Sequence, residues 1–277
     1  MIMGRYDEGR YAGKVAVVTG GGSGLGAAFA RLVVDEGGSI VIADISGDRA
    51  KAVAAELGPR AHAVTCDVTK EPQVAKAIDA AVKKFGRLDG VFANAGIVGA
   101  AGPLATTPLE DYDKTMNVLC RGVFATVKHA ARVLQEQGQG GAIVCTSSVA
   151  GIVGGLGPHV YTVAKTAVIG MTRSAASELM AYGIRVNAIS PGAIPTGMTA
   201  HVMTGDAEAV DKAAAAMAAR AKIGRAGTAD DIAETALFLM SDAGSYLTGQ
   251  VLVVDGGELI APYSTNWTTP RMVVARP

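Results

Sequence analysis

The chain has 277 residues, 49% of them apolar and 18% charged, which is long enough to bury a large hydrophobic core. Lys plus Arg and Asp plus Glu each total 25, so the formal net charge is zero and the chain lacks the basic excess of a nucleic-acid-binding protein. The N-terminal MIMGRYDEGRYAGK is too charged for a signal peptide, and no run of about 18 uncharged apolar residues occurs, so we expect a soluble, cytoplasmic protein without a membrane span.

Short β-branched runs alternate with longer alanine-rich runs along the whole chain. We expect strands at 14–20, 39–45, 61–68, 88–96, 141–151, 184–192 and 250–257, with helices between them at 24–38, 46–58, 71–86, 109–138, 158–180 and 228–242. Each strand is a continuous apolar run, which is typical of a sheet covered by helices on both faces. The strict alternation predicts an α/β fold with one doubly wound parallel sheet. No linker interrupts the pattern, so we expect residues 1–277 to form a single domain.

Three details complete the expected organisation. Thr228 stands where it would cap the last helix, with Asp231 in the first turn of that helix. Residues 193–226 have weak structural signals and are interpreted as a mobile flap. The tail, 258–277, lies beyond the last strand and contains Trp267; it either crosses to a neighbouring subunit, closes the substrate pocket or is loosely ordered.

The three cysteines, Cys66, Cys120 and Cys145, are widely spaced. They form no pair with metal-ligand spacing and no cluster with the four histidines, so the sequence predicts no metal site. We expect them to be buried, unpaired thiols in a reducing compartment.

A glycine-rich turn, VVTGGGSGLG, joins the first expected strand to the first expected helix. It places Gly20, Gly24 and Gly26 where the backbone must turn tightly. Such a turn lets a pyrophosphate approach the free N–H groups and the positive dipole at the start of the helix. A glycine-rich turn alone is weak support, but a strand before it and a helix after it are what phosphate binding requires.

The spacing of this turn, T-G-x-x-x-G-x-G with Thr19 first, resembles the cofactor loop of the short-chain dehydrogenase/reductase family. The resemblance extends from about residue 12 to 257, and it implies a Rossmann fold and a nicotinamide dinucleotide as cofactor. The cofactor-binding positions that it implies, together with those read from the loop itself, are Gly20, Gly22, Ser23, Gly24, Leu25, Gly26, Asp44, Ile45, Asp67, Val68, Asn94, Ala95, Gly96, Tyr161, Lys165, Pro191, Gly192, Ile194 and Thr196.

Asp44 closes the second expected strand. A carboxylate there accepts hydrogen bonds from both ribose hydroxyls of an adenosine and repels a 2′-phosphate. No Arg or Lys occupies positions 21–23 or 45, where a phosphate would need one, so we expect NAD rather than NADP. The resemblance implies that Asp67, with Val68 beside it, contacts the adenine edge. Asn94, in a sequence NAG where the family has NNAG, is expected to stabilise a turn.

Tyr161 and Lys165 stand four residues apart in PHVYTVAKTAVIG, a spacing that alone would be a chance pair on a helix. In the family that the chain resembles, they act with a serine thirteen residues before the tyrosine, which is Ser148, and with an asparagine, which is Asn117. Ser147 does not fit this spacing and is expected either to pack or to make a local hydrogen bond.

A chemical argument supports the same group. A free phenol, with a pKa near 10, is a weak base at pH 7, and a nearby cation favours the phenolate. Lys165 shares a helix face with Tyr161 and is therefore expected to lower the pKa of the phenol. Tyr161 would be the general acid/base, Ser148 would stabilise the substrate oxygen, and Asn117 would hold a water that links Lys165 to solvent.

The sequence PGAIPT follows the sixth expected strand and resembles the family loop that holds the nicotinamide carboxamide. By this match, the Ile194 backbone and Thr196 fix the carboxamide, and Pro191 and Gly192 shape the turn. Asn187, just before the loop, is expected to be a structural hydrogen bonder.

The segments expected around the substrate, 97–104, 149–159 and 193–205, are apolar and almost uncharged. They favour a lipophilic secondary alcohol or ketone, cyclic and terpenoid- or steroid-like, and the approach to Tyr161 resembles that of plant-type secondary-alcohol dehydrogenases. His159 either lines the pocket mouth or makes a local hydrogen bond.

Two other functions remain open: an NADP-dependent carbonyl or 3-ketoacyl reductase, and a nucleotide-binding protein without catalysis. The expected helices 109–138 and 158–181 carry apolar residues on more than one face, and the resemblance implies a homotetramer built on them.

Overall fold

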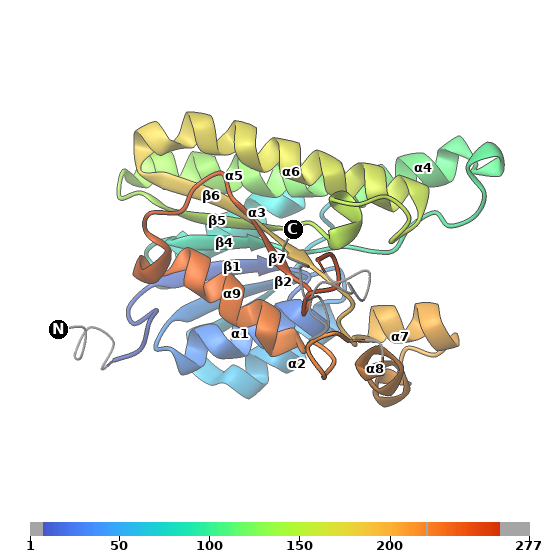
Figure 1. Cartoon of the computed structure of the whole chain (residues 1–277). Helices are drawn as coiled ribbons and strands as arrows, with labels where there is room; N and C mark the ends of the chain where they lie inside the picture. The colour runs from blue at the N-terminus through green and yellow to red at the C-terminus, as the bar shows by residue number, and fades with distance from the viewer. Residues whose placement is uncertain (1–7, 220, 261–277) are drawn as a thin grey trace, which may run out of the picture.

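All strands of the computed structural model, which describes residues 8–219 and 221–260, belong to one sheet (Figure 1). The strands are β1 (Val15–Thr19), β2 (Ser39–Asp44), β3 (Ala61–Thr65), β4 (Gly90–Ala93), β5 (Gly141–Thr146), β6 (Ile184–Pro191) and β7 (Val251–Val254). Every pair is parallel, in the order β3-β2-β1-β4-β5-β6-β7. The fold is therefore the expected α/β fold with a doubly wound parallel sheet, and the strand order reverses direction between β1 and β4.

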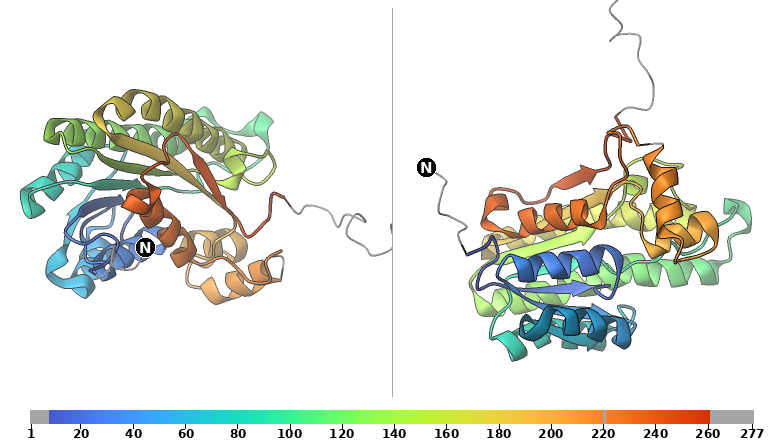
Figure 2. Two further views of the ribbon diagram at one scale, coloured as in Figure 1. Left: turned by 60° about the vertical axis from the view of Figure 1, so that its left-hand side comes forward. Right: turned by 90° about the horizontal axis from the view of Figure 1, so that it is seen from below.

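Helices cover both faces of this sheet (Figures 1 and 2). They are α1 (Gly24–Asp35), α2 (Gly47–Leu57), α3 (Glu71–Phe85), α4 (Leu109–Met116), α5 (Gly122–Gln137), α6 (His159–Leu179), α7 (Gly197–Thr204), α8 (Val210–Ala218) and α9 (Ala229–Met240). Helices α1, α2 and α9 pack on one face, and α3, α5 and α6 on the other. None of the helices in the described ranges combines the length and the apolar character that crossing a membrane requires.

Alternate residues of each strand enter opposite cores, which explains the continuous apolar runs. Val18 of β1 faces α1 and α9, where the rings of Phe29 and Phe92 meet edge to face with their centroids 5.0 Å apart. Val17 faces α3 and α5 and pairs in register with Val41 of β2 on one side. All of these side chains are fully buried, so both faces of the sheet exclude water.

The expected helix 109–138 is divided by a π-helical turn, Asn117–Arg121, between α4 and α5. A π turn holds one residue more than an α turn, and the apolar spacing around it stays close to helical. The sequence therefore predicted the length of this helical segment and missed the change of pitch at Asn117.

The segment 193–226 is more regular than its sequence predicted, since it contains α7 and α8. The hydroxyl of Thr196 accepts from the Thr199 N–H, and the Thr196 N–H donates to the Thr199 hydroxyl, so these two residues form a capping box. Gly205 ends α7 in the left-handed conformation with φ +79°. At α9 the predicted cap is confirmed, because the Thr228 hydroxyl accepts from the Asp231 N–H.

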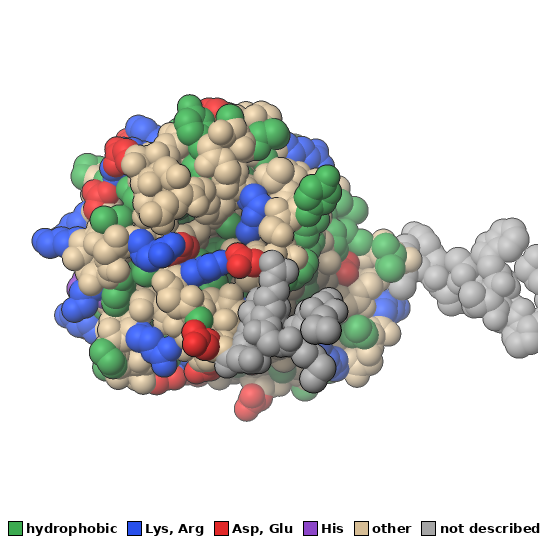
Figure 3. All heavy atoms as spheres, turned by 90° about the vertical axis from the view of Figure 1, so that its left-hand side faces the viewer, with side chains coloured by type: hydrophobic (Ala, Val, Ile, Leu, Met, Phe, Trp, Pro, Cys, Tyr) green, Lys and Arg blue, Asp and Glu red, His purple; other side chains and the backbone are tan. Residues whose placement is uncertain are grey.

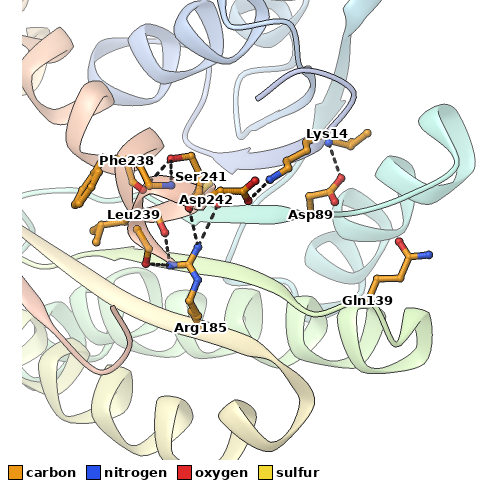
Figure 4. A network of polar contacts seen from close by, with 12 residues as sticks. Lys14, Asp89, Gln139, Arg185, Phe238, Leu239, Ser241 and Asp242 are labelled. Carbon is orange, nitrogen blue, oxygen red and sulfur yellow. Dashed lines mark hydrogen bonds and ion pairs between the residues drawn. The ribbon is translucent and has the colours of Figure 1, made fainter. Parts of the chain in front are cut away.

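A polar network closes the amino end of the sheet (Figure 4). Arg185, at the start of β6, donates to backbone carbonyls at the end of α9 and just after it, including Gly244 at 2.8 Å and Ser241 at 3.2 Å. Asp89 accepts from the Val15 N–H at 2.8 Å, which ties the loop before β4 to β1. The bonds from Arg185 to the carbonyls of Leu239 and Met240 satisfy acceptors in the last turn of α9, which have no partner within the helix.

The surface at this amino end carries basic and acidic side chains side by side, without a field of one sign (Figure 3). All three cysteines are free; Cys66 and Cys145 are buried as expected, whereas Cys120 is only half-buried. No group of three or more His, Cys, Asp or Glu side chains in the described part of the chain is arranged to hold a metal ion.

Candidate functional site

The glycine turn between β1 and α1 has a geometry that only glycine allows. Gly20 has φ +67° and Gly24 has φ +51°, a region that favours glycine. A Cβ atom on Gly26 would lie 2.2 Å from the carbonyl oxygen of Gly20, which is far inside contact distance. The backbone of the turn and the start of α1 therefore pack directly against each other, with no room for side chains.

The start of α1 fits an anionic group. Ser23 is its N-cap, but the Ser23 side chain makes no capping hydrogen bond, and no acidic residue lies in the first turn. The first N–H groups of the helix thus lack a capping side chain, and no carboxylate within the first turn offsets the positive end of the helix dipole. With the cradle formed by Gly20 and Gly26, these groups suit the pyrophosphate of a dinucleotide.

Asp44, at the carboxyl end of β2, lies beside this turn. One carboxylate oxygen accepts from the Gly22 N–H at 2.9 Å, and the other accepts from the Ser46 N–H at 2.9 Å and from the Arg49 guanidinium at 3.2 Å. The Asp44 side chain is only 5% exposed, whereas that of Arg49 is 56% exposed. Positions 21–23 and 45, where a cation was expected to accompany a 2′-phosphate, carry none, but Arg49 at the start of α2 brings a cation that was not expected there.

Asn94, after β4, links the glycine turn to β5. Its amide donates to the carbonyls of Thr19 at 3.1 Å and Gly20 at 3.4 Å, and its carbonyl accepts from the Thr146 hydroxyl at 3.3 Å. The Thr19 hydroxyl in turn accepts from the N–H groups of Asn94 and Ala95. Asn94 therefore stabilises the turn, and through Thr146 it reaches the strand that leads to Ser148.

Lys165 is buried in α6, with only 3% of its surface exposed. Its ammonium donates to the Thr146 carbonyl at 2.8 Å and lies 5.5 Å from the centroid of the Tyr161 ring. Burial lowers the pKa of Lys165 to about 8. Thr146, which holds the lysine through its main chain, was not singled out from the sequence because a backbone acceptor leaves no side-chain signal.

The Tyr161 phenol has a raised pKa, first because it is buried, while a hydrogen bond with Ser148 acts in the opposite direction. The net direction is upward because desolvation outweighs this hydrogen bond, and the expectation that Lys165 lowers the pKa of Tyr161 stays a prediction. Ser148 lies in the turn between β5 and α6, and its hydroxyl also accepts from the Ala150 N–H at 3.2 Å. The structure thus brings Ser148, Tyr161 and Lys165 together.

The other polar residues near the triad take separate places. Ser147 donates to the Lys165 carbonyl at 2.8 Å, which is the local bond that was one of its two expected roles. Asn117 opens the π turn and lines a groove between α5 and α6. Within the described ranges its side chain has no hydrogen bond to Lys165 or to any other residue. Asn187 donates to the Leu247 carbonyl and accepts from the Gln250 N–H, as a structural hydrogen bonder does.

The remaining predicted positions line the carboxyl ends of the strands. The Gly192 N–H donates to Val254 at 3.0 Å, and Ile194 is buried beside a cavity of about 690 Å³ that α8 also lines. Asp67 accepts from the N–H and the hydroxyl of Thr69. Val68 is buried, whereas Ile45 is 65% exposed. Leu25 packs against the core on the α1 side of the sheet. Gly96 follows β4, and Pro191 ends β6.

Comparisons with known proteins agree with this geometry. A family model described as "Enoyl-(Acyl carrier protein) reductase" matches residues 20–258. Short-chain dehydrogenase reductase 3a of Arabidopsis thaliana is 43% identical over 250 residues, which are 90% of this chain and 96% of that protein. Momilactone A synthase of Oryza sativa subsp. japonica is 45% identical over 255 residues, 91% of this chain and 92% of that protein.

The chain belongs to the short-chain dehydrogenase/reductase family.

Among solved structures, that of Levodione Reductase matches this short-chain dehydrogenase/reductase with a TM-score of 0.81 and 39% identity, covering 90% of this chain and 98% of that one. Members of the family are oxidoreductases that bind a nicotinamide dinucleotide. In this short-chain dehydrogenase/reductase the glycine turn, the start of α1 and Asp44 form the surface that fits the dinucleotide, and the triad of Ser148, Tyr161 and Lys165 lies at the same edge of the sheet.

Proposed function

We propose that this chain is an NAD-dependent oxidoreductase that interconverts a lipophilic secondary alcohol and its ketone. The observation that carries the proposal is the placement of Ser148 and Lys165 around the Tyr161 phenol, at the sheet edge that bears the dinucleotide-binding turn. NAD, when bound, supplies the acceptor or donor of a hydride.

The residues of the chain would move the proton. Tyr161 takes the proton of the alcohol in oxidation and returns it to the alkoxide in reduction, as a general base or acid. Ser148 donates a hydrogen bond to the same substrate oxygen and stabilises its developing charge. Lys165 is held by Thr146 under the ring, and its cation favours the phenolate. Asn117 would hold a water between Lys165 and solvent.

The proposed substrate class rests on exposed apolar side chains in the segments expected near Tyr161. Ile97, Val153 and Leu156 are 40 to 45% exposed, and Met198 of α7 is 43% exposed. Apolar side chains that remain accessible around a polar centre favour a lipophilic ligand. By their names, Momilactone A synthase forms momilactone A and Levodione Reductase reduces a dione. These names support the proposal that the substrate is a cyclic, terpenoid-like alcohol or ketone.

The preference for NAD rests on Asp44, whose carboxylate would accept from the ribose hydroxyls and repel a 2′-phosphate. A second candidate, an NADP-dependent carbonyl or 3-ketoacyl reductase, is favoured by one observation, the Arg49 guanidinium 3.2 Å from that carboxylate. Titration of the protein with NADH and with NADPH distinguishes the two, because tighter binding of NADPH would reject the first.

We also propose a cytoplasmic homotetramer. Three unpaired cysteines suit a reducing compartment. A groove of about 880 Å³ between α5 and α6 includes Phe124, which is 58% exposed, and a second copy of the chain would cover it.

The decisive experiment is a panel of cyclic secondary alcohols, offered with NAD while NADH formation is followed by absorbance. We expect turnover with at least one apolar ring alcohol and none with phosphorylated sugars. If no alcohol or ketone in the panel is turned over although NADH binds, the chain is instead a nucleotide-binding protein without this catalysis.

A further inference from the structure

The loop that follows β4 runs past the triad and leads toward α4. It starts beside Lys165, since a Cβ atom added to Gly96 would lie 3.9 Å from the lysine side-chain nitrogen. Ile97, the next residue, is 40% exposed and belongs to an apolar segment expected around the substrate. Beyond the loop, α4 packs beside α6, the helix that carries Tyr161 and Lys165 (Figure 1). The loop is therefore placed to form one wall of the proposed substrate pocket.

The main chain of this loop has a single anchor. Within the described part of the chain, residues 96–102 make one main-chain hydrogen bond, in which the Ala100 N–H donates to the Thr115 hydroxyl at 2.9 Å. Most residues of the loop are exposed, so packing contributes little to its conformation. The position of the loop therefore depends on the bond to Thr115.

Thr115 lies in the last turn of α4, and its side chain is oriented toward this loop. It is 1% exposed, and its hydroxyl donates to the Asp111 carbonyl at 2.7 Å, one turn earlier in the helix. Because the hydroxyl proton is used in that bond, the oxygen is left as an acceptor for the Ala100 N–H. A Cβ atom added to Gly99, which has φ +74°, would lie inside contact distance of the Thr115 methyl carbon. The loop backbone thus rests directly on Thr115.

We propose that Thr115 is a positioning residue for the substrate. Its hydroxyl holds residues 96–102 beside the triad, so that Ile97 and its neighbours form a fixed apolar wall for a lipophilic alcohol or ketone. A wall that is already in place spares the substrate the cost of ordering the loop when it binds.

This inference rests on the proposed function and deepens it. It assigns part of the substrate affinity to a buried hydroxyl that touches neither the substrate nor the cofactor. Dinucleotide binding should not depend on Thr115, because Asn94, at the start of the same loop, is held separately by the hydroxyl and the carbonyl of Thr19.

Four proteins test the inference: wild type, Thr115→Val, Thr115→Ser and Thr126→Val. Valine keeps the branched shape and removes the hydroxyl, whereas serine keeps the hydroxyl. Thr126 is the matched control, since it is also 1% exposed and its hydroxyl donates to a carbonyl one turn earlier, that of Gly122 at 2.8 Å, but no loop N–H donates to it in the described chain. Thermal unfolding checks that each protein folds.

Three measurements are made on each protein. Steady-state kinetics use saturating NAD and the first cyclic secondary alcohol of the panel that wild type oxidises. Fluorescence titration gives the affinity for NADH. Hydrogen–deuterium exchange, followed by mass spectrometry on peptides that cover residues 96–102, reports how firmly the loop is held without requiring turnover.

In Thr115→Val we expect KM for the alcohol to rise at least about fivefold, which corresponds to the loss of one hydrogen bond. The kcat value should change less than about threefold, because the wall binds substrate and transition state alike. NADH affinity should stay within about threefold of wild type, and exchange in residues 96–102 should become faster. Thr115→Ser should restore KM to within about twofold of wild type, and Thr126→Val should behave as wild type.

An unchanged KM in a folded, active Thr115→Val protein would overturn the inference, and so would an equal rise of KM in Thr126→Val. A Thr115→Ser protein as impaired as Thr115→Val would show that the hydroxyl is not the cause. If Thr115→Val does not fold, Thr115→Ala removes the hydroxyl with less bulk and should show the same rise of KM. A wild type that binds NADH but turns over no alcohol or ketone would instead reject the proposed function, and this role with it.

Discussion

Lys165 has a pKa of about 8 because its ammonium is buried with one carbonyl acceptor, that of Thr146. At neutral pH most Lys165 side chains are thus still charged, but the pH lies only about one unit below the pKa. A small change in the surroundings of Lys165 therefore alters the charge beside Tyr161. The Tyr161 phenol, whose pKa is raised by burial, needs exactly such added positive charge before it can act as a base. An oxidised nicotinamide ring bound beside Tyr161 would supply such a positive charge and would favour the phenolate.

The role proposed for Tyr161 predicts the effect of Tyr161→Phe. Removing the hydroxyl leaves the ring and its packing but takes away the group that moves the proton, so turnover should fall at least about hundredfold. NADH binding, measured by fluorescence titration, should stay within about threefold of wild type. Tyr182→Phe is the control, because Tyr182 is 53% exposed in the turn after α6. Retained turnover in Tyr161→Phe would refute the proposed role.

The lowered pKa of Lys165 predicts a pH-dependent stability. The unfolded chain holds the lysine proton up to about pH 10.5, whereas the folded chain releases it near pH 8. Below pH 8 both states are protonated and the folded state bears the full cost of the buried charge; as pH rises from 8 to 10.5 this cost is lost.

The free energy of unfolding of wild type, relative to that of Lys165→Met, should accordingly rise by up to about 3 kcal/mol between pH 7 and pH 10.5. Urea unfolding at several pH values measures it. Lys51→Met, which changes an exposed lysine, should show a flat difference, and a flat difference for Lys165→Met would contradict the lowered pKa.

At the scale of elements, the junction of β1 and α1 determines where the dinucleotide lies. Gly26→Ala would push a methyl group against the Gly20 carbonyl oxygen, a backbone atom that has no room to move. We expect a loss of about 2 kcal/mol or more in stability, as for other overpacked sites, and dinucleotide affinity weakened by at least about tenfold. Gly154→Ala, with no atom within 4 Å of the added methyl, is the control for thermal unfolding and titration. Equal behaviour of the two variants would rule out this tight fit.

The sequence was sufficient for the sheet, since its buried strands are continuous apolar runs and the helices between them force parallel pairing. It was also sufficient to bring Ser148, Tyr161 and Lys165 together, because their spacing resembles that of a known family. It did not reveal the π turn at Asn117, whose extra residue changes pitch without changing apolar spacing. Nor did it reveal the Asp44–Arg49 pair or the raised pKa of Tyr161, which depend on distances across elements and on burial.

At the scale of the whole molecule, the groove between α5 and α6 is the surface on which the proposed assembly depends. Phe124→Glu would place a charge on an apolar face that a second copy would bury in the proposed tetramer, so the variant should lose tetramers in favour of smaller species. Light scattering or sedimentation gives the mass. A wild-type mass near that of one subunit would reject the homotetramer, and an unchanged mass for the variant would place the interface elsewhere.

The two ends of the sheet have different tasks. The carboxyl end carries the glycine turn, Asp44 and the triad, whereas the amino end is closed by Arg185 and the bonds around Asp89. The described chain also starts at this amino end, where the Glu8 backbone lies against Gly37, which follows α1. A linker joined ahead of Glu8 would therefore anchor the enzyme to a solid support with its reactive edge turned toward the flowing substrate solution.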